Sequence, residues 1–293
     1  MRKLPLVFTA LFCAQLFSPL FAQPAPAQPC DRACLTNVIT VYLDALLKHD
    51  PALLPQAPAV RFTEDHQELQ LGEGLWQHIE ALGNFRQDVI DVRNGIAGVH
   101  VVAIEHGVPV LVAVRLTVKN GLIAAVESTV VRNREEGMIF NPEAVIEASA
   151  AMNVTPAEAQ RNTREEMIRL ALLYPEGLRI GSFVNADAQF ATDAYRFENG
   201  QLMAGPGCTF MAGCERIREQ RLPTLAGIQE KVAGVDEEQG IVWLRMNFGA
   251  GSLMRGEGEL SVWEMFKIYD GRIQAVEAFM EVVPAGTPFG WEY

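Results

Sequence analysis

The sequence predicts an α+β protein that contains two copies of one unit. Each half reads as a helix followed by a series of long strands, an order typical of α+β proteins with antiparallel sheets. Sequence matches also recur between the halves in the same order, which indicates a duplicated domain. The matched segments are RFTEDHQEL at 61–69 with RFENGQLM at 196–203, GVHVVAI at 98–104 with GIVWLRM at 240–246, and KNGLIAAVESTVV at 119–131 with YDGRIQAVEAFMEVV at 269–283.

The first copy opens with a helix. Asp31 is a suitable N-cap, and apolar residues from Leu35 to Leu47 recur at helical spacing to form one continuous stripe. The helix is expected to end at His49-Asp50-Pro51, because a residue before proline avoids helical geometry. A short strand over 61–64 and a second helix over 72–83 are expected next.

Long strands follow in both copies. In the first copy they are expected over 85–93, 98–105, 108–118 and 121–131, with Asn120-Gly121 as a hairpin turn. Helix starts are expected at Asn141-Pro142 and Thr155-Pro156, and the opening helix of the second copy should end near Tyr174-Pro175. The strands of the second copy are then expected over 195–198, 240–248, 259–269 and 272–283.

The chain divides into five expected regions. Arg2 and Lys3 precede an apolar run that ends in a small residue, the order of a secretory signal peptide. The expected regions are a signal peptide at 1–22, a proline-rich leader at 23–29, a first domain at 30–135, a helical linker at 136–160 and a second domain at 161–293. We therefore expect an exported protein, periplasmic or extracellular.

Composition and charge exclude several function classes. The 293 residues are 49% hydrophobic and 20% charged, which predicts a folded chain with a core. Lys and Arg number 24 against 36 Asp and Glu, for a formal charge of −12. Nucleic-acid binding and polybasic membrane binding both need concentrated positive charge, so neither is expected. The interrupted N-terminal apolar run also argues against stable membrane insertion, and the sequence gives no oligomeric state.

Four cysteines remain after removal of the signal peptide. Four cysteines allow three pairings, and we favour the two local ones, Cys30 with Cys34 and Cys208 with Cys214. Their spacings differ from the usual C-x2-C half-site of zinc sites, and no paired histidine motif is present, so no metal is expected.

The motifs carry a resemblance to known families. A helix, a short strand, a helix and four strands ending in x-(D/N)-G-x-I-x-x-V-E resembles the NTF2-like superfamily, which includes SnoaL-like cyclases, ketosteroid isomerases and scytalone dehydratases. The segments CDRACL, YLDALLKHDP, RFTE, LGEGLW and ENG look like a tandem-domain family of secreted fungal and bacterial proteins described as a domain of unknown function. The resemblance spans about residues 30–283. It implies two tandem cone-shaped NTF2-like domains, each with helices packed on a curved antiparallel sheet around an apolar pocket.

Two residues on apolar strand faces are candidates for catalysis. His100 shares a face with Val102 and Ile104, where desolvation would lower its pKa, although a structural core histidine is the alternative. Arg115 interrupts a similar face, and a buried arginine needs a carboxylate or an anionic ligand. A structural ion pair with Glu127 or Glu105 is the competing interpretation.

Other candidates complete the expected site. Glu64 is a candidate general base or part of a structural ion pair, and Tyr42 would polarise a carbonyl or simply pack in the core. Trp76, His78, Trp243 and Arg245 are expected to contact the substrate. The matching Glu127 and Glu277 are expected on solvated strand faces.

These residues suggest a cofactor-independent lyase or isomerase that acts on a small apolar molecule. In this hypothesis His100 or Glu64 moves a proton, and Tyr42 or Arg115 stabilises an oxyanion. Two other classes stay open: a non-catalytic carrier of a small molecule and a structural scaffold. No cofactor is expected, because the glycine-rich segment 249–258 contains neither a P-loop nor a dinucleotide motif.

Overall fold

The computed structural model describes residues 30–250 and 258–291, and the predicted signal peptide and leader lie outside these ranges. The described chain forms three α-helices and two six-stranded sheets. The helices are α1 Arg32–Leu47, α2 Arg134–Gly137 and α3 Arg164–Ile180. The strands of the first sheet are β1 Gln56–Glu64, β2 Gln67–Glu68, β3 Ile79–Asp91, β4 Ile96–Glu105, β5 Val108–Lys119 and β6 Leu122–Val131. Those of the second are β7 Phe190–Glu198, β8 Gln201–Ala204, β9 Gln229–Asp236, β10 Ile241–Asn247, β11 Glu259–Tyr269 and β12 Arg272–Val283.

The two sheets have the same strand order. It is β2-β1-β6-β5-β4-β3 in the first and β8-β7-β12-β11-β10-β9 in the second. Both sheets are mixed, because β1 runs parallel to β6 and β7 runs parallel to β12, whereas the other pairs are antiparallel. The predicted fold class, α+β cones with helices packed on antiparallel sheets, is therefore wrong. The described chain is mostly β, with one long helix beside each mixed sheet.

The helix predicted over 72–83 is also wrong. This segment forms a 3₁₀ helix at Gly74–Gln77 and then enters β3 at Ile79. Gly72 and Gly74 have φ values of +106° and +67°, which an α-helix cannot contain. Leu75 and Ile79 are both buried, so their spacing reflected burial rather than helical structure.

The long helices begin at side-chain caps. Asp31 accepts a hydrogen bond from the Cys34 N–H at the start of α1, and Thr163 caps α3 in the same way. The opening helix of the second copy was expected to end near Tyr174-Pro175. Pro175 instead lies inside α3, which continues to Ile180. Tyr174 and Leu178, on either side of the proline, are buried in the core. Their packing offsets the backbone hydrogen bond that proline cannot donate.

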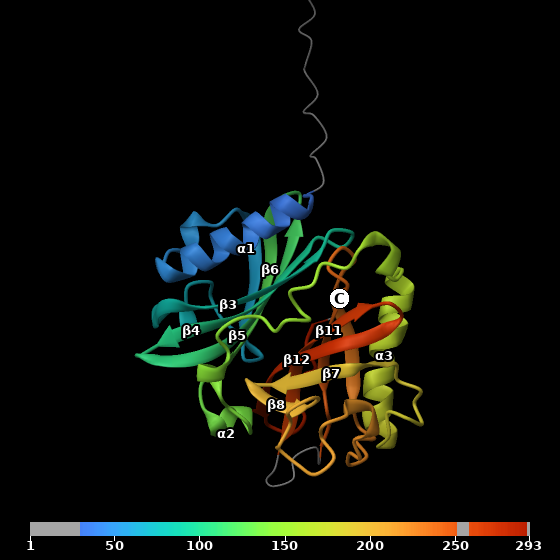
Figure 1. Ribbon diagram of the computed structural model, residues 1–293. Coiled ribbons are helices and arrows are strands. Elements are labelled where there is room, and N and C mark those ends of the chain that lie inside the picture. The colour runs from blue at the N-terminus through green and yellow to red at the C-terminus, as the bar shows by residue number, and fades with distance from the viewer. Residues whose placement is uncertain (1–29, 251–257, 292–293) are drawn as a thin grey trace, which may run out of the picture.

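The molecule has four layers. Figure 1 shows α1 and α3 on opposite sides with the two sheets between them. One face of each sheet packs against its own helix, and these two interiors are filled by buried apolar side chains. The other faces of the two sheets meet in a third apolar cluster, which includes Phe85, Val102, Trp243, Trp263 and Phe279.

Two reciprocal ion pairs join the units. Arg32, the first residue of α1, donates two hydrogen bonds of 2.7 and 3.0 Å to Asp236 at the end of β9. Arg164, the first residue of α3, donates bonds of 3.0 and 2.6 Å to Asp91 at the end of β3. Both aspartates are fully buried. Each helix start is therefore fixed to the opposite sheet.

Both predicted disulfides are confirmed. Cys30 pairs with Cys34 beside the start of α1, and Cys208 pairs with Cys214 in the loop after β8. Among the described residues, no helix combines the length and the apolar character that a membrane span requires.

Candidate functional site

His100 lies between the two sheets. It projects from β4 away from α1, stacks on Phe279 with ring centroids 4.4 Å apart and meets the edge of Trp243. Burial lowers the pKa of His100 to about 3, so the ring is neutral at physiological pH. Its Nε2 has no hydrogen-bond partner in the structure. Trp243, expected to contact a substrate, packs here instead, within the apolar layer between the sheets.

Arg115 and Arg245 lie in the same layer. The Nε of Arg115 donates a 2.9 Å hydrogen bond to the Ala233 carbonyl of the second sheet. Arg245 stacks on Trp263 at 4.6 Å, and its Nε lies 3.6 Å from a carboxylate oxygen of Glu127. These contacts join the sheets. Neither arginine lines the apolar pocket described below.

Glu64 lies elsewhere, at the end of β1. Its carboxylate accepts the Leu75 N–H and pairs with Arg132 at 3.0 Å. Burial, the largest influence, raises the pKa of Glu64, although the Leu75 N–H and Arg132 oppose this effect. Arg132 also binds Asp65 and Glu105, so the arrangement is a four-residue ionic cluster.

The remaining predicted residues do not converge. Tyr42 is buried in the interior of the first unit, where its ring meets Trp76 edge to face at 5.4 Å, and burial raises its pKa. His78 is exposed and its ring lies 4.7 Å from that of His106, at a tilted angle. The structure therefore brings Tyr42 and Trp76 together, and separately His100 and Trp243, but does not assemble the predicted set into one site.

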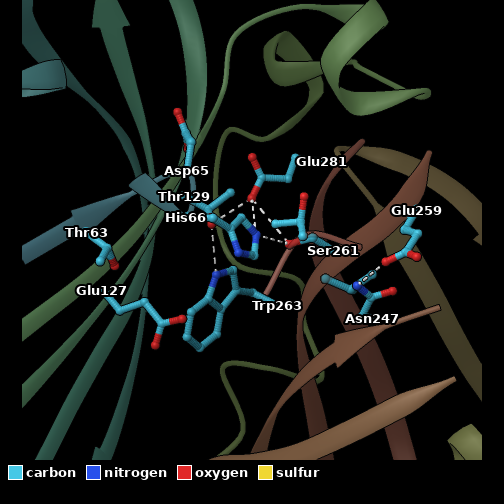
Figure 2. A network of polar contacts seen from close by, with 12 residues as sticks. Thr63, Asp65, His66, Glu127, Thr129, Asn247, Glu259, Ser261, Trp263 and Glu281 are labelled. Carbon is cyan, nitrogen blue, oxygen red and sulfur yellow. Dashed lines mark hydrogen bonds and ion pairs between the residues drawn. The ribbon is translucent and has the colours of Figure 1, made fainter. Parts of the chain in front are cut away.

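A polar network built around His66 joins the two sheets. Figure 2 shows the His66 ring beside Ser261 and Glu281 of the second sheet. The Nε2 atom lies 2.9 Å from the Ser261 hydroxyl, 3.3 Å from Glu281 and 3.0 Å from Nη2 of Arg245. Thr129 extends the network by donating to Glu281 and accepting from Trp263.

This network lacks the geometry of a nucleophilic triad. A triad histidine uses one ring nitrogen for the serine and the other for the acid, whereas here Ser261 and Glu281 meet the same nitrogen. The Ser261 hydroxyl donates to Glu281, and His66 Nδ1 lies 3.2 Å from the Pro288 carbonyl. We therefore interpret the network as a structural connection.

The linker, residues 132–163, forms a pocket against the face of the second sheet that meets the first sheet, and Phe85 of β3 also lines it. Near its start, Asn199 donates to the carbonyls of Gly137 and Ile139, at 3.1 and 2.8 Å. Near its end, the buried Lys267 ammonium donates to the carbonyls of Met152 and Val154. Between these anchors the linker borders a pocket of about 180 Å³. The lining residues are Phe85, Ala144, Val145, Glu147, Ala148, Ser149, Ala150, Phe197, Gly200, Glu277, Ala278 and Phe279.

Two adjacent polar side chains, Ser149 and Glu277, form one wall of the pocket, and Tyr195 contacts Ser149 from outside the lining. Ser149 donates to the carboxylate of Glu277 and contacts the hydroxyl of Tyr195. Tyr195 also accepts a 3.2 Å hydrogen bond from the Ala151 N–H. Burial raises the pKa of Glu277 and raises that of Tyr195 to about 12. The arrangement places a carboxyl group and a hydroxyl in a cavity whose other lining residues are mostly apolar.

The sequence reasoning missed this site. Glu277 was expected on a solvated face, yet it is only 9% exposed because the linker covers it. Ser149 and Tyr195 were not singled out, and no local pattern marks them. The recurrence of Glu127 as Glu277 was the signal available. For a metal, the described part of the chain offers no cluster of three His, Cys, Asp or Glu side chains in ligating positions.

Comparisons with known proteins relate the second unit to a family of unknown function. A family model described as "Domain of unknown function (DUF8021)" matches residues 160–280, which supports the predicted resemblance to such a family for the second unit. No curated protein matches the chain. One solved structure, titled "Crystal structure of a de novo designed protein with curved beta-sheet", is 18% identical with a TM-score of 0.30. The match covers 34% of this chain and 87% of that chain, and a TM-score this low supports no argument.

Proposed function

We propose that this chain is an exported protein that binds one small, mostly apolar molecule in the linker pocket. The observation that carries the proposal is the pocket itself. It is an apolar cavity of about 180 Å³ with a few polar groups on one wall. Ligand sites have this composition, because apolar walls supply affinity and a few polar groups orient the ligand.

The pocket volume limits the ligand. A dry cavity of roughly 150 Å³ is enough to hold benzene. The linker pocket therefore suits one ring with a small substituent. The helix-facing interiors of both units are filled by their own side chains, so this pocket is the better-supported location.

Export is the second part of the proposal. It is supported by the two disulfides and by the predicted signal peptide, because disulfides persist in oxidising compartments. We also propose that the chain is related to NTF2-like proteins. This relationship rests on the sequence motifs, and the family match reported above does not name that superfamily. The pocket proposed here lies outside the helix-facing interiors that such kinship would favour.

Proton transfer in this pocket is a second candidate function. The observation that favours it is the buried Glu277 carboxyl, whose raised pKa is the kind that suits a general acid or base. A cofactor-independent lyase or isomerase reaction would use Glu277, with the Ser149 and Tyr195 hydroxyls positioning it. Chemical change of a bound ligand would favour this candidate over simple binding.

Blocking the pocket tests the binding proposal. Ala150 lines the pocket and is exposed, so Ala150→Trp should fill the entrance without disturbing the core. Ala285→Trp is the matched control, because Ala285 is exposed and does not line the pocket. We expect benzyl alcohol and benzylamine to shift NMR signals of pocket residues in the wild type and the control, but not in Ala150→Trp. Absence of binding by both probes, or equal binding to Ala150→Trp, would contradict the proposal.

A further inference from the structure

We propose that the ligand of the linker pocket is a small organic cation, an amine carried on a single ring. This inference rests on the proposed function, because it names the ligand class for the same pocket. It is based on the charge of the lining, on a comparison between equivalent positions in the two units, and on the aromatic walls.

The charged residues of the lining are both acidic. They are Glu147, which is exposed, and Glu277, which is buried. Within the described chain Glu277 has no ion pair, and its carboxylate accepts hydrogen bonds from the neutral hydroxyl and the backbone N–H of Ser149. A buried carboxylate is costly unless a cation or several hydrogen bonds compensate it. Among the residues that the structure describes, the side chains around Glu277 include no cation that would supply this compensation.

The first unit also has a glutamate at the position equivalent to Glu277, and there the charge of the carboxylate is compensated. Glu127 on β6 and Glu277 on β12 are equivalent, because each lies six residues after the turn glycine, Gly121 or Gly271. The strand pairing also shifts register at the same place before each glutamate, between β5 and β6 in the first sheet and between β11 and β12 in the second. The two glutamates therefore have the same backbone setting.

The partners of these two glutamates differ. Arg115 lies directly opposite Glu127 in the sheet, and Arg245 approaches Glu127 at 3.6 Å. The residue opposite Glu277 is Met265, which carries no charge. Glu127 thus has a guanidinium group from each unit beside it, Arg115 of the first and Arg245 of the second, whereas Glu277 borders a pocket. A ligand cation would occupy the role that arginine has in the first unit.

The aromatic walls suit the same ligand. Phe85, Phe197 and Phe279 line the pocket, and the centroids of Phe85 and Phe279 are 6.0 Å apart. Phenylalanine faces attract cations within about 6 Å and also pack against an apolar ring. An ammonium group at Glu277 would therefore gain both a carboxylate partner and aromatic neighbours.

Three probes of similar size test the inference on the full chain. Isothermal titration calorimetry would measure benzylamine, benzyl alcohol and phenylacetate, which differ mainly in charge. We expect benzylamine to bind at least about tenfold more tightly than benzyl alcohol, and phenylacetate to bind most weakly, because a desolvated charge pair is strong only with the opposite sign. Glu277→Gln should remove the preference for benzylamine and leave benzyl alcohol binding within about threefold.

The controls separate this inference from the proposed function. Glu143→Gln changes the same charge on an exposed linker residue that does not line the pocket, and it should leave the preference intact. Equal wild-type affinities for benzylamine and benzyl alcohol would overturn the cation inference but retain the binding pocket. A preference that persists in Glu277→Gln would also overturn it. If Glu277→Gln fails to fold, the ranking of the three probes with the wild type still decides. If no probe binds, the proposed function fails as well.

Discussion

The two units place different chemistry at equivalent positions of the same strand order. In the first unit the helix-facing side of the sheet contains Phe62 opposite Val126. In the second unit the equivalent residue is Arg196, opposite Val276. Val114 of the first unit likewise corresponds to Glu264, since these residues lie opposite Ser128 and Ala278. An apolar interior in one unit is therefore a partly ionic interior in the other.

The ionic interior of the second unit is compact. Arg196 pairs with Glu198 at 2.9 Å and donates a 3.1 Å hydrogen bond to the Tyr174 hydroxyl. Burial raises the pKa of Glu264 to about 8, and the nearby Glu198 adds to this shift. The comparison teaches that strand order and helix position persist while the interior changes from apolar to charged.

The largest expected effect concerns the reciprocal ion pairs. Asp91→Asn and Asp236→Asn should each destabilise the protein by about 3–5 kcal/mol, because each removes a fully buried carboxylate charge that pairs with an arginine and accepts a backbone N–H of the opposite sheet. Urea denaturation measures the loss. Glu176→Gln, at an exposed pair on α3, should cost less than about 1 kcal/mol. A loss of stability in only one of the two variants would contradict the inference that both ion pairs join the units.

A pH-dependent effect of comparable size should follow from the titration of Glu264. Its folded-state pKa of about 8 lies above its ordinary value of 4.5, so the folded protein holds this proton more tightly than the unfolded chain. The contribution of Glu264 to stability should therefore be fully present below pH 4.5 and should be lost as the pH rises to about 8, by about 1 kcal/mol per pH unit. In Glu264→Gln this contribution disappears.

Denaturation midpoints at several pH values measure the difference between wild type and Glu264→Gln. Glu165→Gln, an exposed substitution in α3, is the control and should keep the wild-type pH dependence. An unchanged slope in Glu264→Gln would show that the interior of the second unit does not titrate in this way.

The smallest expected effect concerns the contact between the sheets. A Cβ on Gly98 would lie 2.2 Å from a ring carbon of Trp243, so Gly98→Ala should destabilise by about 1–3 kcal/mol through overpacking. Gly234→Ala is the matched control on a neighbouring strand of the second sheet, because its new Cβ would meet Ile96 at an ordinary 3.5 Å. Equal thermal stability of the two variants would contradict the close approach of Trp243 to Gly98.

The sequence predicted the elements that local patterns determine. The apolar stripe of α1, the hairpin at Asn120-Gly121 and the long strands were found, because periodicity and turn residues specify them. The match of Arg61 with Arg196 failed by one residue: Arg61 is exposed beside Trp291, whereas Arg196 is buried. A shift of one residue moves a strand side chain to the opposite face.

The candidate site could not be predicted for a different reason. His100 and Val102 were correctly placed on one apolar face, but the sequence does not reveal that the second sheet covers this face. Likewise, Glu277 becomes part of a pocket only because the linker passes over β12 at Ser149. Both outcomes depend on contacts between segments more than 100 residues apart, such as the 128-residue separation of Ser149 and Glu277.

The approach of Trp243 to Gly98 has a consequence for each half taken alone. The register makes Gly98 and Trp243 equivalent, since Gly98 lies opposite Arg115 and Trp243 lies opposite Met265. The match of 98–104 with 240–246, which aligned Gly98 with Gly240, is therefore wrong by three residues. Two copies of the first half would face each other with a gap, and two copies of the second half would collide through their indoles. Self-association of either half would therefore be poorer than the union of unlike halves. Because the two halves are joined in one chain, one half can carry the Trp243 indole while the other carries the space at Gly98. A symmetric homodimer would have the same residue on both halves.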